Sequence, residues 1–196
     1  MKEKPLRRSN RERTEITRIR LLDAARQLFL ERGYAETSTP DVVRAAGVTR
    51  GALYHHFSDK KDLFRAVVER EANQVAETID RDAPASLPAD AALLTGAEVF
   101  LEAMREPGRV RLLLLDGPAV LGWEELTRLD VAHGRRTLRE GLLHALPAND
   151  DDESTLDALA DVLSAAFDRA ALAIAEGAPP EPYHHALRAL LRALLR

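Results

Sequence analysis

Two short helical patterns meet at the segment Ala46-Gly47-Val48, and this junction constrains the fold more than any other feature of the chain. The first pattern begins at Ser38 or Thr39, both of which are residue types that cap helix N-termini. Gly47 permits a tight turn, and a second helix is predicted over residues 49–57. Two short helices joined in this way are typical of a helix-turn-helix unit.

Helix-forming residues dominate the composition, and apolar residues recur at helical spacing. The chain has only 10 glycines in 196 residues, so an all-α fold is expected. The stretch 81–90, with two prolines, is predicted to be a loop, and residues 116–118 a kink or turn. Besides the two short helices, we predict helices over about 12–32, 58–80, 91–105, 109–115, 123–146, 154–176 and 182–195.

Positive charge is concentrated at the N-terminal end of an acidic chain. Residues 1–62 carry 14 Lys and Arg against 9 Asp and Glu, a net charge of +5, whereas residues 63–196 carry 14 against 23, a net charge of −9. This asymmetry predicts a small cationic head that meets an anion; chance clustering of charges is the alternative. We expect a flexible basic arm at 1–12, a helix-turn-helix domain at 13–62 and a helical domain at 63–196.

Several classes of protein are excluded by what the sequence lacks. It has no cysteine, and we find no catalytic triad, P-loop or glycine-rich phosphate cradle, so we expect no enzyme and no cofactor. His133 and His144 share a helical face only loosely and are a weak metal pair, so no metal site is expected. The charged N-terminus has no apolar secretory segment, and the longest apolar run, residues 112–115, is too short for a membrane span. These observations predict a cytoplasmic protein.

A polar surface remains on the second short helix once the expected core is removed. Thr49 and Arg50 at its start can reach base edges, where an arginine can bind guanine through two hydrogen bonds. We therefore predict binding to double-stranded DNA; a solvated basic face is the alternative. Contacts to phosphate are expected from Thr39, Tyr54, His55 and Lys60. The expected core of this region consists of Leu22, Ala25, Phe29, Val42, Val43, Ala46, Val48, Leu53 and Phe57.

The stretch LLDAARQLFLERGYAETSTPDVVRAAGVTRGALYHHFSDKKDLF, residues 21–64, resembles the N-terminal domain of the TetR (tetracycline repressor) family. The resemblance covers about a quarter of the chain. Val42-Val43 stands where the family usually has Ile-Ala, and His56 beside His55 leaves two candidates for one phosphate contact. The resemblance implies DNA contacts by Thr39, Arg50, Tyr54, His55 and Lys60, with Thr49 and Gly51 at the groove.

The last two predicted helices carry wide apolar stripes, which predict a dimer interface of two helices from each subunit. The family that the N-terminal region resembles also uses such an interface, and burial within the monomer is the alternative. A two-fold dimer would present two recognition helices to DNA, so the operator should be a near-palindrome. The interface is expected to contain Leu156, Leu159, Leu163, Phe167, Leu187, Leu190, Leu191 and Leu194.

A methionine and several aromatic residues between the head and the last helices can line a cavity for a small-molecule effector. Ordinary core packing is the alternative for each of them. The sequence does not identify the effector, the operator or the regulated genes. The residues predicted to line the cavity are Phe100, Met104, Leu113, Trp123, Leu126, His133 and Phe167.

Together these features predict a homodimeric transcriptional regulator, a repressor that leaves its operator when a small molecule binds. The expected mechanism is a shift of population in which the fourth helix, common to both domains, moves. Two alternatives stay open at this point: an activator that binds DNA only with its ligand, and a ligand-binding dimer without DNA binding.

Overall fold

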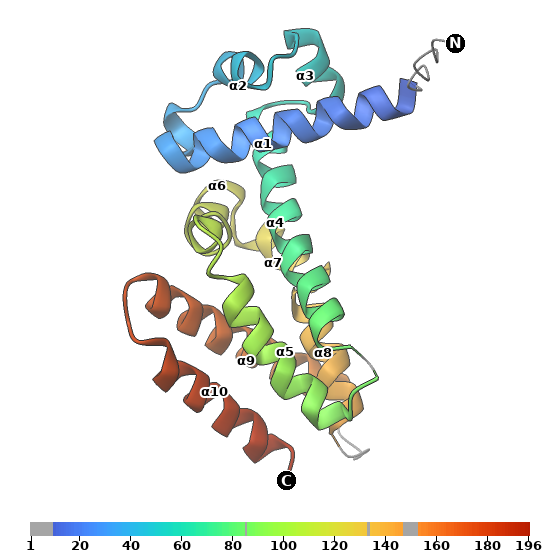
Figure 1. Ribbon diagram of the computed structural model, residues 1–196, viewed down its shortest axis with the longest axis vertical. Helices are drawn as coiled ribbons and strands as arrows, with labels where there is room; N and C mark the ends of the chain where they lie inside the picture. Colours follow the sequence, from blue (N-terminus) through green and yellow to red (C-terminus); the bar gives the residue numbers. More distant parts are fainter. Residues whose placement is uncertain (1–9, 85, 133, 147–152) are drawn as a thin grey trace, which may run out of the picture. The chain divides into compact units, whose positions relative to one another are not determined.

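A computed structural model describes residues 10–84, 86–132, 134–146 and 153–196. All regular secondary structure in these ranges is helical, as the sequence predicts (Figure 1). No helix among the described residues is long and apolar enough to cross a membrane. The helices are α1 (Asn10–Glu36), α2 (Thr39–Ala46), α3 (Arg50–His56), α4 (Lys60–Asp82), α5 (Ala89–Ala103), the π-helix η1 (Arg111–Asp116), α6 (Gly117–Leu121), α7 (Trp123–Ala132), α8 (Gly134–Ala145), α9 (Glu153–Ala175) and α10 (Pro180–Leu194).

The chain divides into two compact units, residues 1–67 and residues 68–196. The division falls inside α4, a little beyond the boundary predicted after residue 62. Helix α4 therefore supplies its first turns to the N-terminal unit and its later turns to the C-terminal unit.

In the N-terminal unit, α2 and α3 both pack against α1, and Figure 1 shows them on the same side of it. The apolar side chains that meet there include most of the predicted core, together with Phe64 at the start of α4. The rings of Phe29 and Phe64 meet edge to face with their centroids 5.1 Å apart, and the centroids of the Tyr34 and Phe64 rings are 5.2 Å apart. Of the nine predicted core residues, those that the structure buries are Leu22, Ala25, Phe29, Val42, Leu53 and Phe57, whereas Val43, Ala46 and Val48 are half-buried.

Local hydrogen bonds fix the ends of the two short helices. Ser38 caps α2, since its side chain accepts from the backbone N–H of Asp41 at 3.3 Å. Gly47 ends α2 in the left-handed conformation (φ 62°), which glycine adopts without steric cost. Thr49 caps α3 by accepting from the N–H of Ala52 at 3.2 Å. These caps hold the turn between α2 and α3 in one conformation.

Helix α1 differs from the prediction at both ends. It begins at Asn10, so residues 10–12 are helical and not part of an arm, and residues 1–9 of the predicted arm lie outside the described residues. At the other end Gly33 (φ 81°) interrupts the helical backbone, and one further turn follows. The buried Thr37 hydroxyl lies 2.8 Å from the carbonyl oxygen of Gly33 and 3.1 Å from that of Leu28, which secures this end.

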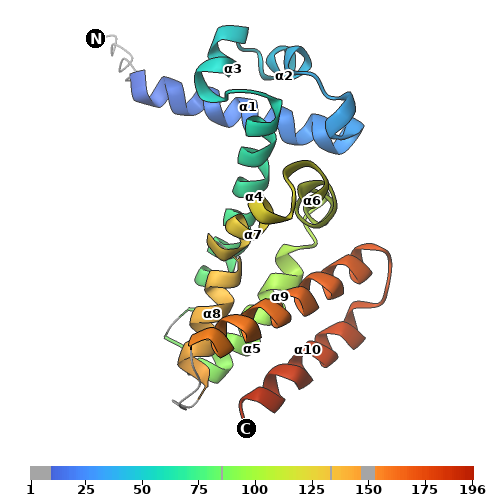
Figure 2. The same ribbon diagram turned by 180° about the vertical axis from the view of Figure 1, so that it is seen from behind.

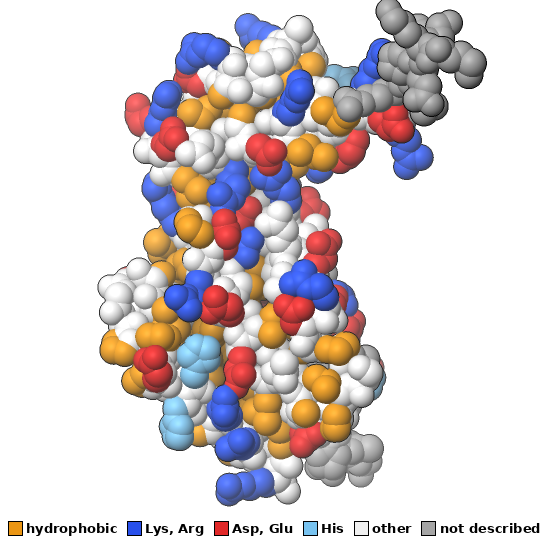
Figure 3. Space-filling model, viewed as in Figure 1, with side chains coloured by type: hydrophobic (Ala, Val, Ile, Leu, Met, Phe, Trp, Pro, Cys, Tyr) orange, Lys and Arg blue, Asp and Glu red, His pale blue; other side chains and the backbone are white. Residues whose placement is uncertain are grey.

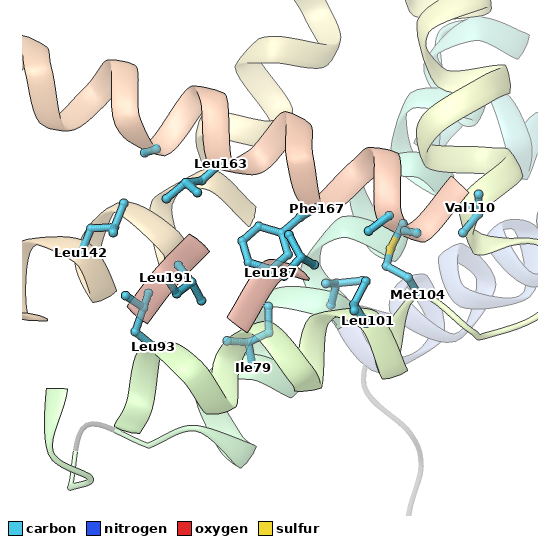
Figure 4. Packing of buried hydrophobic residues seen from close by; sticks show 14 residues of the cluster. Ile79, Leu93, Leu101, Met104, Val110, Leu142, Leu163, Phe167, Leu187 and Leu191 are labelled. Carbon is cyan, nitrogen blue, oxygen red and sulfur yellow. The ribbon is translucent and has the colours of Figure 1, made fainter. Parts of the chain in front are cut away.

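The C-terminal unit is a bundle in which α5, α8, α9 and α10 enclose the main hydrophobic core. Figures 1 and 2 show α10 returning alongside α9 in roughly the opposite direction. In the core, Phe167 of α9 and Leu187 of α10 point toward Ile79 and Leu101 (Figure 4). The helix predicted over 123–146 corresponds to α7 and α8, which are described on either side of residue 133.

Residues 116–118, where a kink or turn was predicted, do not form a turn, because the backbone stays helical from η1 into α6. Asp116 and Gly117 both have right-handed helical dihedral angles, and Pro118 occupies the first turn of α6, where its missing N–H is tolerated. A Cβ on Gly117 would lie only 2.9 Å from the carbonyl oxygen of Leu112. Glycine is thus required here by close packing of the backbone.

A buried ion pair joins three helices of the C-terminal unit. Arg109, just before η1, donates from Nε to Glu71 Oε2 of α4 at 3.1 Å and from Nη2 to Gln74 Oε1 at 2.9 Å. Its Nη1 donates to the carbonyl oxygen of Ala103, the last residue of α5, at 2.6 Å. Both charged side chains are buried, so removing either one leaves the other in a poorly solvated site.

We predict that Arg109→Met lowers the free energy of unfolding by about 3–5 kcal/mol, because the buried Glu71 carboxylate loses this counter-charge. Urea denaturation followed by circular dichroism measures the change. Arg111→Met is the matched control, since Arg111 pairs with Asp116 on the surface at 3.2 Å and should contribute less than about 1 kcal/mol. Equal losses in the two variants would contradict the assigned importance of the buried pair.

Candidate nucleic-acid interface and internal cavity

Helix α3 presents one polar face to solvent and buries the opposite one. Leu53 anchors the buried face, while Thr49, Arg50, Tyr54 and His55 are exposed. Because α3 is short and capped at its start by Thr49, these side chains project from a fixed backbone. All of the residues predicted for α3 as DNA contacts are accessible in the N-terminal unit.

Three of the predicted residues form a connected group across α2 and α3. The Arg50 guanidinium lies over the Tyr54 ring, 5.4 Å from its centroid, and the Tyr54 hydroxyl lies 3.4 Å from Thr39 Oγ1. The hydrogen bond with Thr39, and then the neighbouring Arg50, hold the pKa of Tyr54 below its usual value. The ring thus positions the guanidinium at the surface, and Thr39 links the start of α2 to α3.

Gly51 leaves the first turn of α3 without a side chain on its exposed side. The nearest atom to a Cβ built there would be Thr49 Oγ1 at 4.0 Å, so internal packing does not require glycine. A bare backbone at this point lets a flat or bulky partner approach the helix start closely.

The two adjacent histidines of α3 have different surroundings. His55 is exposed, whereas His56 is half-buried and lies against the Phe57 ring, with centroids 6.1 Å apart. Burial, and then the charges of His55 and Arg18, lower the pKa of His56. His55 is therefore the imidazole that faces solvent.

Lys60 is engaged within the protein, which the sequence did not indicate. Its Nζ donates to the carbonyl oxygens of Tyr34 at 2.9 Å and Ala35 at 3.3 Å, and lies 4.3 Å from the centroid of the Tyr34 ring. These contacts join the start of α4 to the end of α1. Two of the three ammonium protons are therefore engaged by carbonyl groups of the protein.

A cavity of about 510 Å³ lies inside the C-terminal unit, among α4, α5, α7, α8 and α9. This volume is in the range of small-molecule sites. Two wall residues are glycines within helices, Gly96 of α5 and Gly141 of α8. A Cβ at Gly141 would lie only 3.2 Å from the Leu93 side chain, and one at Gly96 would lie 3.5 Å from Ile79, so these glycines allow the helices of the wall to pack closely. Glycines inside the helices predicted over 91–105 and 123–146 are the sequence feature that marks these two wall positions.

Two of the seven residues predicted to line an effector cavity lie in the wall of this cavity. Phe100 and Phe167 line the cavity, and their rings meet edge to face at 5.6 Å. Met104 is buried away from it, and Trp123 is 78% exposed on the surface. Helical spacing identified apolar residues without indicating which face of each helix meets the cavity. The remaining predicted residues are Leu113 and Leu126, which are half-buried elsewhere, and His133, which lies outside the described residues.

The predicted dimer interface also needs revision. Leu163, Phe167, Leu187 and Leu191 are at most 5% exposed, because the chain's own helices cover them. A partner cannot cover side chains that are already buried. Leu156, Leu159 and Leu194 are half-buried and Leu190 is 50% exposed. The outward apolar face, as the structure has it, contains Ala158, Val162 and Ala165 of α9 and Ala186, Ala189, Leu190 and Ala193 of α10.

Acidic side chains predominate among the charged groups of the cavity wall. Asp80, Asp130, Glu140 and Asp168 line it, against the single guanidinium of Arg136. Burial, and then the negative charge of Asp130, raise the pKa of Asp168 to about 7. None of these residues was predicted from the sequence to belong to a ligand site.

The comparisons with known proteins agree with the fold. Residues 21–67 match the family described as bacterial regulatory proteins, tetR family, and residues 91–196 match the tetracyclin repressor-like C-terminal domain. The transcriptional regulator AcrR from Shigella flexneri is 39% identical over 83 residues, which cover 42% of this chain and 38% of AcrR. The repressor BepR from Brucella suis is 46% identical over 65 residues, covering 33% of this chain and 31% of BepR. The chain thus matches less than half the length of these curated relatives.

Solved structures match over nearly the whole chain. A TetR-family transcriptional regulator from Pectobacterium atrosepticum is 35% identical, with 96% of each chain covered and a TM-score of 0.67. LfrR from Mycobacterium smegmatis, solved in complex with proflavine, is 25% identical, with 91% of this chain and 96% of LfrR covered and a TM-score of 0.61. With one family domain over residues 21–67 and another over more than half of its length, the chain belongs to the TetR family of bacterial regulatory proteins.

Proposed function

We propose that this chain is a cytoplasmic, homodimeric transcriptional repressor that binds a near-palindromic DNA operator and leaves it when a small molecule occupies the cavity. The observation that carries the proposal is the connected exposed group of Arg50, Tyr54 and Thr39, held by capped helices in the cationic N-terminal unit. The name of BepR, a transcriptional repressor, supports the direction of control. The proposal contains no catalytic step.

In this proposal the contacts divide by role. Base edges are read from the start of α3, where Arg50 can bind guanine through two hydrogen bonds. Phosphates are bound by hydroxyl, imidazole and ammonium groups around the start of α3. Lys60 can contribute only the N–H that does not donate to the carbonyl oxygens of Tyr34 and Ala35. His55, not His56, is assigned to phosphate because it is exposed. The base-reading residues are Thr49, Arg50 and Gly51, and the phosphate-binding residues are Thr39, Tyr54, His55 and Lys60.

A second copy of the chain is proposed to cover the outward apolar face of α9 and α10. Val162 is 67% exposed there, and the alanines around it and around Leu190 allow two helices to approach closely. On the side of the C-terminal unit seen in Figure 3, hydrophobic side chains reach the surface among charged ones. Two-fold pairing of this face would present two copies of α3 and so explain a near-palindromic operator.

Release is proposed to act through α4. Ile79 and Asp80, near the end of this helix, line the cavity, and Lys60 and Phe64 belong to its first turns. A ligand that binds one position of α4 better than another shifts the population toward that position. That LfrR was solved in complex with proflavine supports a small-molecule effector for this chain as well.

A titration decides among the regulatory alternatives. DNA flanking the chain's own gene is tested in a shift assay at several salt concentrations, and candidate effectors are chosen by thermal shift, since a binder raises the melting temperature. Loss of the DNA complex on effector addition supports the repressor. A complex that requires the effector indicates an activator, and a ligand-binding dimer with no salt-dependent DNA complex removes the proposal.

We predict that Arg50→Ala weakens binding to the preferred operator by about 1–3 kcal/mol and relaxes its sequence preference. Tyr54→Phe is the matched comparison, because it keeps the ring under Arg50 and removes only the hydroxyl. It should weaken preferred and unrelated sequences alike, by about 0.5–1.5 kcal/mol. Fluorescence anisotropy on both kinds of DNA measures the split. If the two variants lost affinity for preferred and unrelated DNA in the same way, the assignment of Arg50 to bases and Tyr54 to phosphate would be contradicted.

We predict that Leu190→Arg raises the dimer dissociation constant about 10- to 100-fold, since an apolar side chain at the proposed interface is replaced by a charge. Analytical ultracentrifugation measures it, and circular dichroism verifies that the fold is kept. Leu143→Arg on α8, where Leu143 is 56% exposed outside the proposed interface, is the control and should leave the dimer intact. An unchanged dimer in the Leu190 variant would show that this face is not the interface.

A further inference from the structure

One carboxyl group in the cavity lacks the partner that its neighbours have. Asp168 lines the wall on α9, beside Phe167 and one turn from Ser164. Within the part of the chain that the structure describes, it takes part in no hydrogen bond or ion pair. Asp168 is half-buried. A carboxyl group that is partly shielded from water and has no counter-charge is costly when ionised.

The arginines described near the cavity pair with carboxylates other than Asp168. Arg136 of α8 donates to Glu140 at 2.9 Å and to Asp80 of α4 at 3.5 Å. Arg135, also on α8, pairs with Asp130 of α7 at 3.9 Å and with Asp161 of α9. Asp168 is thus the acid that these guanidinium groups do not neutralise.

Among the described residues, the other groups around the cavity do not supply a counter-charge. His144 of α8 turns its Nδ1 toward the backbone carbonyl oxygen of Glu140, at 2.6 Å. The wall residues of α5 are all apolar or glycine, with Phe100 as the largest, and no residue of α10 lines the cavity. An anionic ligand would therefore meet a wall with an excess of carboxylates.

The rest of the wall suits the body of an aromatic molecule. The edge-to-face rings of Phe100 and Phe167 adjoin Ile79, Leu93 and Leu138, and apolar surface predominates in the cavity. Aromatic ligands pack on such rings in offset or edge-to-face arrangements. The cavity volume of about 510 Å³ leaves room for two or three fused rings.

We propose that the cavity binds a hydrophobic organic cation with an aromatic body, and that the Asp168 carboxylate is its counter-ion. The inference rests on the proposed function in one respect, that this cavity is the effector site. The cation replaces the missing partner of Asp168, while the aromatic body covers the apolar wall. Neutral molecules of the same shape gain only the second contribution.

Binding of a permanent cation is then linked to proton release. The free cavity holds the pKa of Asp168 near 7, through burial and the charge of Asp130, and a bound cation stabilises the ionised form. Below that pH the ligand must displace the proton, so affinity rises as pH rises through it and then levels off. Between pH 6 and pH 8 the expected gain is about tenfold.

The test uses the full-length protein and two matched pairs of fluorescent probes: N-methylquinolinium with quinoline, and N-methylphenanthridinium with phenanthridine. Members of a pair differ by one methyl group and one charge, and the parent heterocycles stay neutral from pH 6 to pH 8. We expect at least one cation to bind at pH 8 at least tenfold more tightly than its neutral parent, as measured by direct fluorescence titration. That cation should also show the pH dependence, and its parent should not.

Asp168→Asn should lower the cation's affinity at pH 8 at least tenfold and abolish its pH dependence, while changing the neutral parent's affinity less than about threefold. Asp157→Asn, on the same helix outside the cavity, makes the same change in net charge and should leave both affinities unchanged. His144→Gln should keep the pH dependence, which separates the carboxyl group from the imidazole in the wall.

The Asp168→Asn variant is expected to fold, because ionisation of Asp168 destabilises the folded state and asparagine does not ionise. Burial raises the folded-state pKa of Asp168 from 3.8 to about 7, so ionisation penalises the folded state increasingly as pH rises across that interval. Removing the carboxylate should therefore raise the melting temperature at pH 8, and by less at pH 5. A variant that is less stable than the parent at pH 8 would contradict the unpartnered state of Asp168.

The outcomes separate this inference from the proposed function. A cation that binds through Asp168 but leaves the operator complex intact supports the proposed class of ligand. It contradicts the proposal that a ligand in the cavity releases the protein from DNA. If no cation binds more tightly than its neutral parent, or if Asp168→Asn leaves the preference unchanged, the ligand class is overturned. Displacement of the operator by a neutral parent would in that case leave the proposed function standing.

Discussion

The buried ion pair between Glu71 and Arg109 is the interaction on which the C-terminal unit depends most. Through one guanidinium it joins the end of α5 and the start of η1, which are neighbours in sequence, to Glu71 of α4, which lies 38 residues before Arg109. Two of these helices, α4 and α5, also form walls of the cavity. The pair does not line the cavity, but it connects two of the helices that do.

Local chemistry made the N-terminal unit predictable. Ser38, Gly47 and Thr49 act through hydrogen bonds and dihedral angles within a few residues of themselves, so their residue types were sufficient to locate the helix ends. The exposed face of α3 could be predicted by setting aside the residues that were expected in the core. Lys60 could not be placed in the same way, because its acceptors, the carbonyl oxygens of Tyr34 and Ala35, lie on another helix. Its residue type suggested phosphate binding, and only the fold revealed that it also secures the end of α1.

The C-terminal unit was less predictable because α9 is apolar on more than one face. Phe167 points into the core and cavity, whereas Val162 points outward. The alanines between them are apolar too, so the sequence does not show where the buried face of α9 ends. A hydrophobic stripe shows that a face is covered without showing what covers it. The predicted interface consequently mixed Leu191, which the chain itself covers, with Leu190, which it does not. Asp168 was overlooked for a related reason, since an acid on a helix is usually solvated and its isolation arises from tertiary packing.

Charge separates the two binding events that the proposals describe. DNA would bind to the N-terminal unit, where cations are in excess, and a cationic effector to the C-terminal unit, where carboxylates are in excess. The two ligands would therefore not compete for the same groups, and any coupling must pass through a change of conformation. A ligand shifts such an equilibrium only by the difference between its affinities for the two states, at about 1.4 kcal/mol for each factor of ten. A charge interaction with a shielded carboxylate is suited to supply that difference, since its strength depends steeply on distance and on exclusion of water. Small movements of α4 or α9 at the cavity wall would thus change the affinity for a cation more than the affinity for a neutral molecule of the same shape.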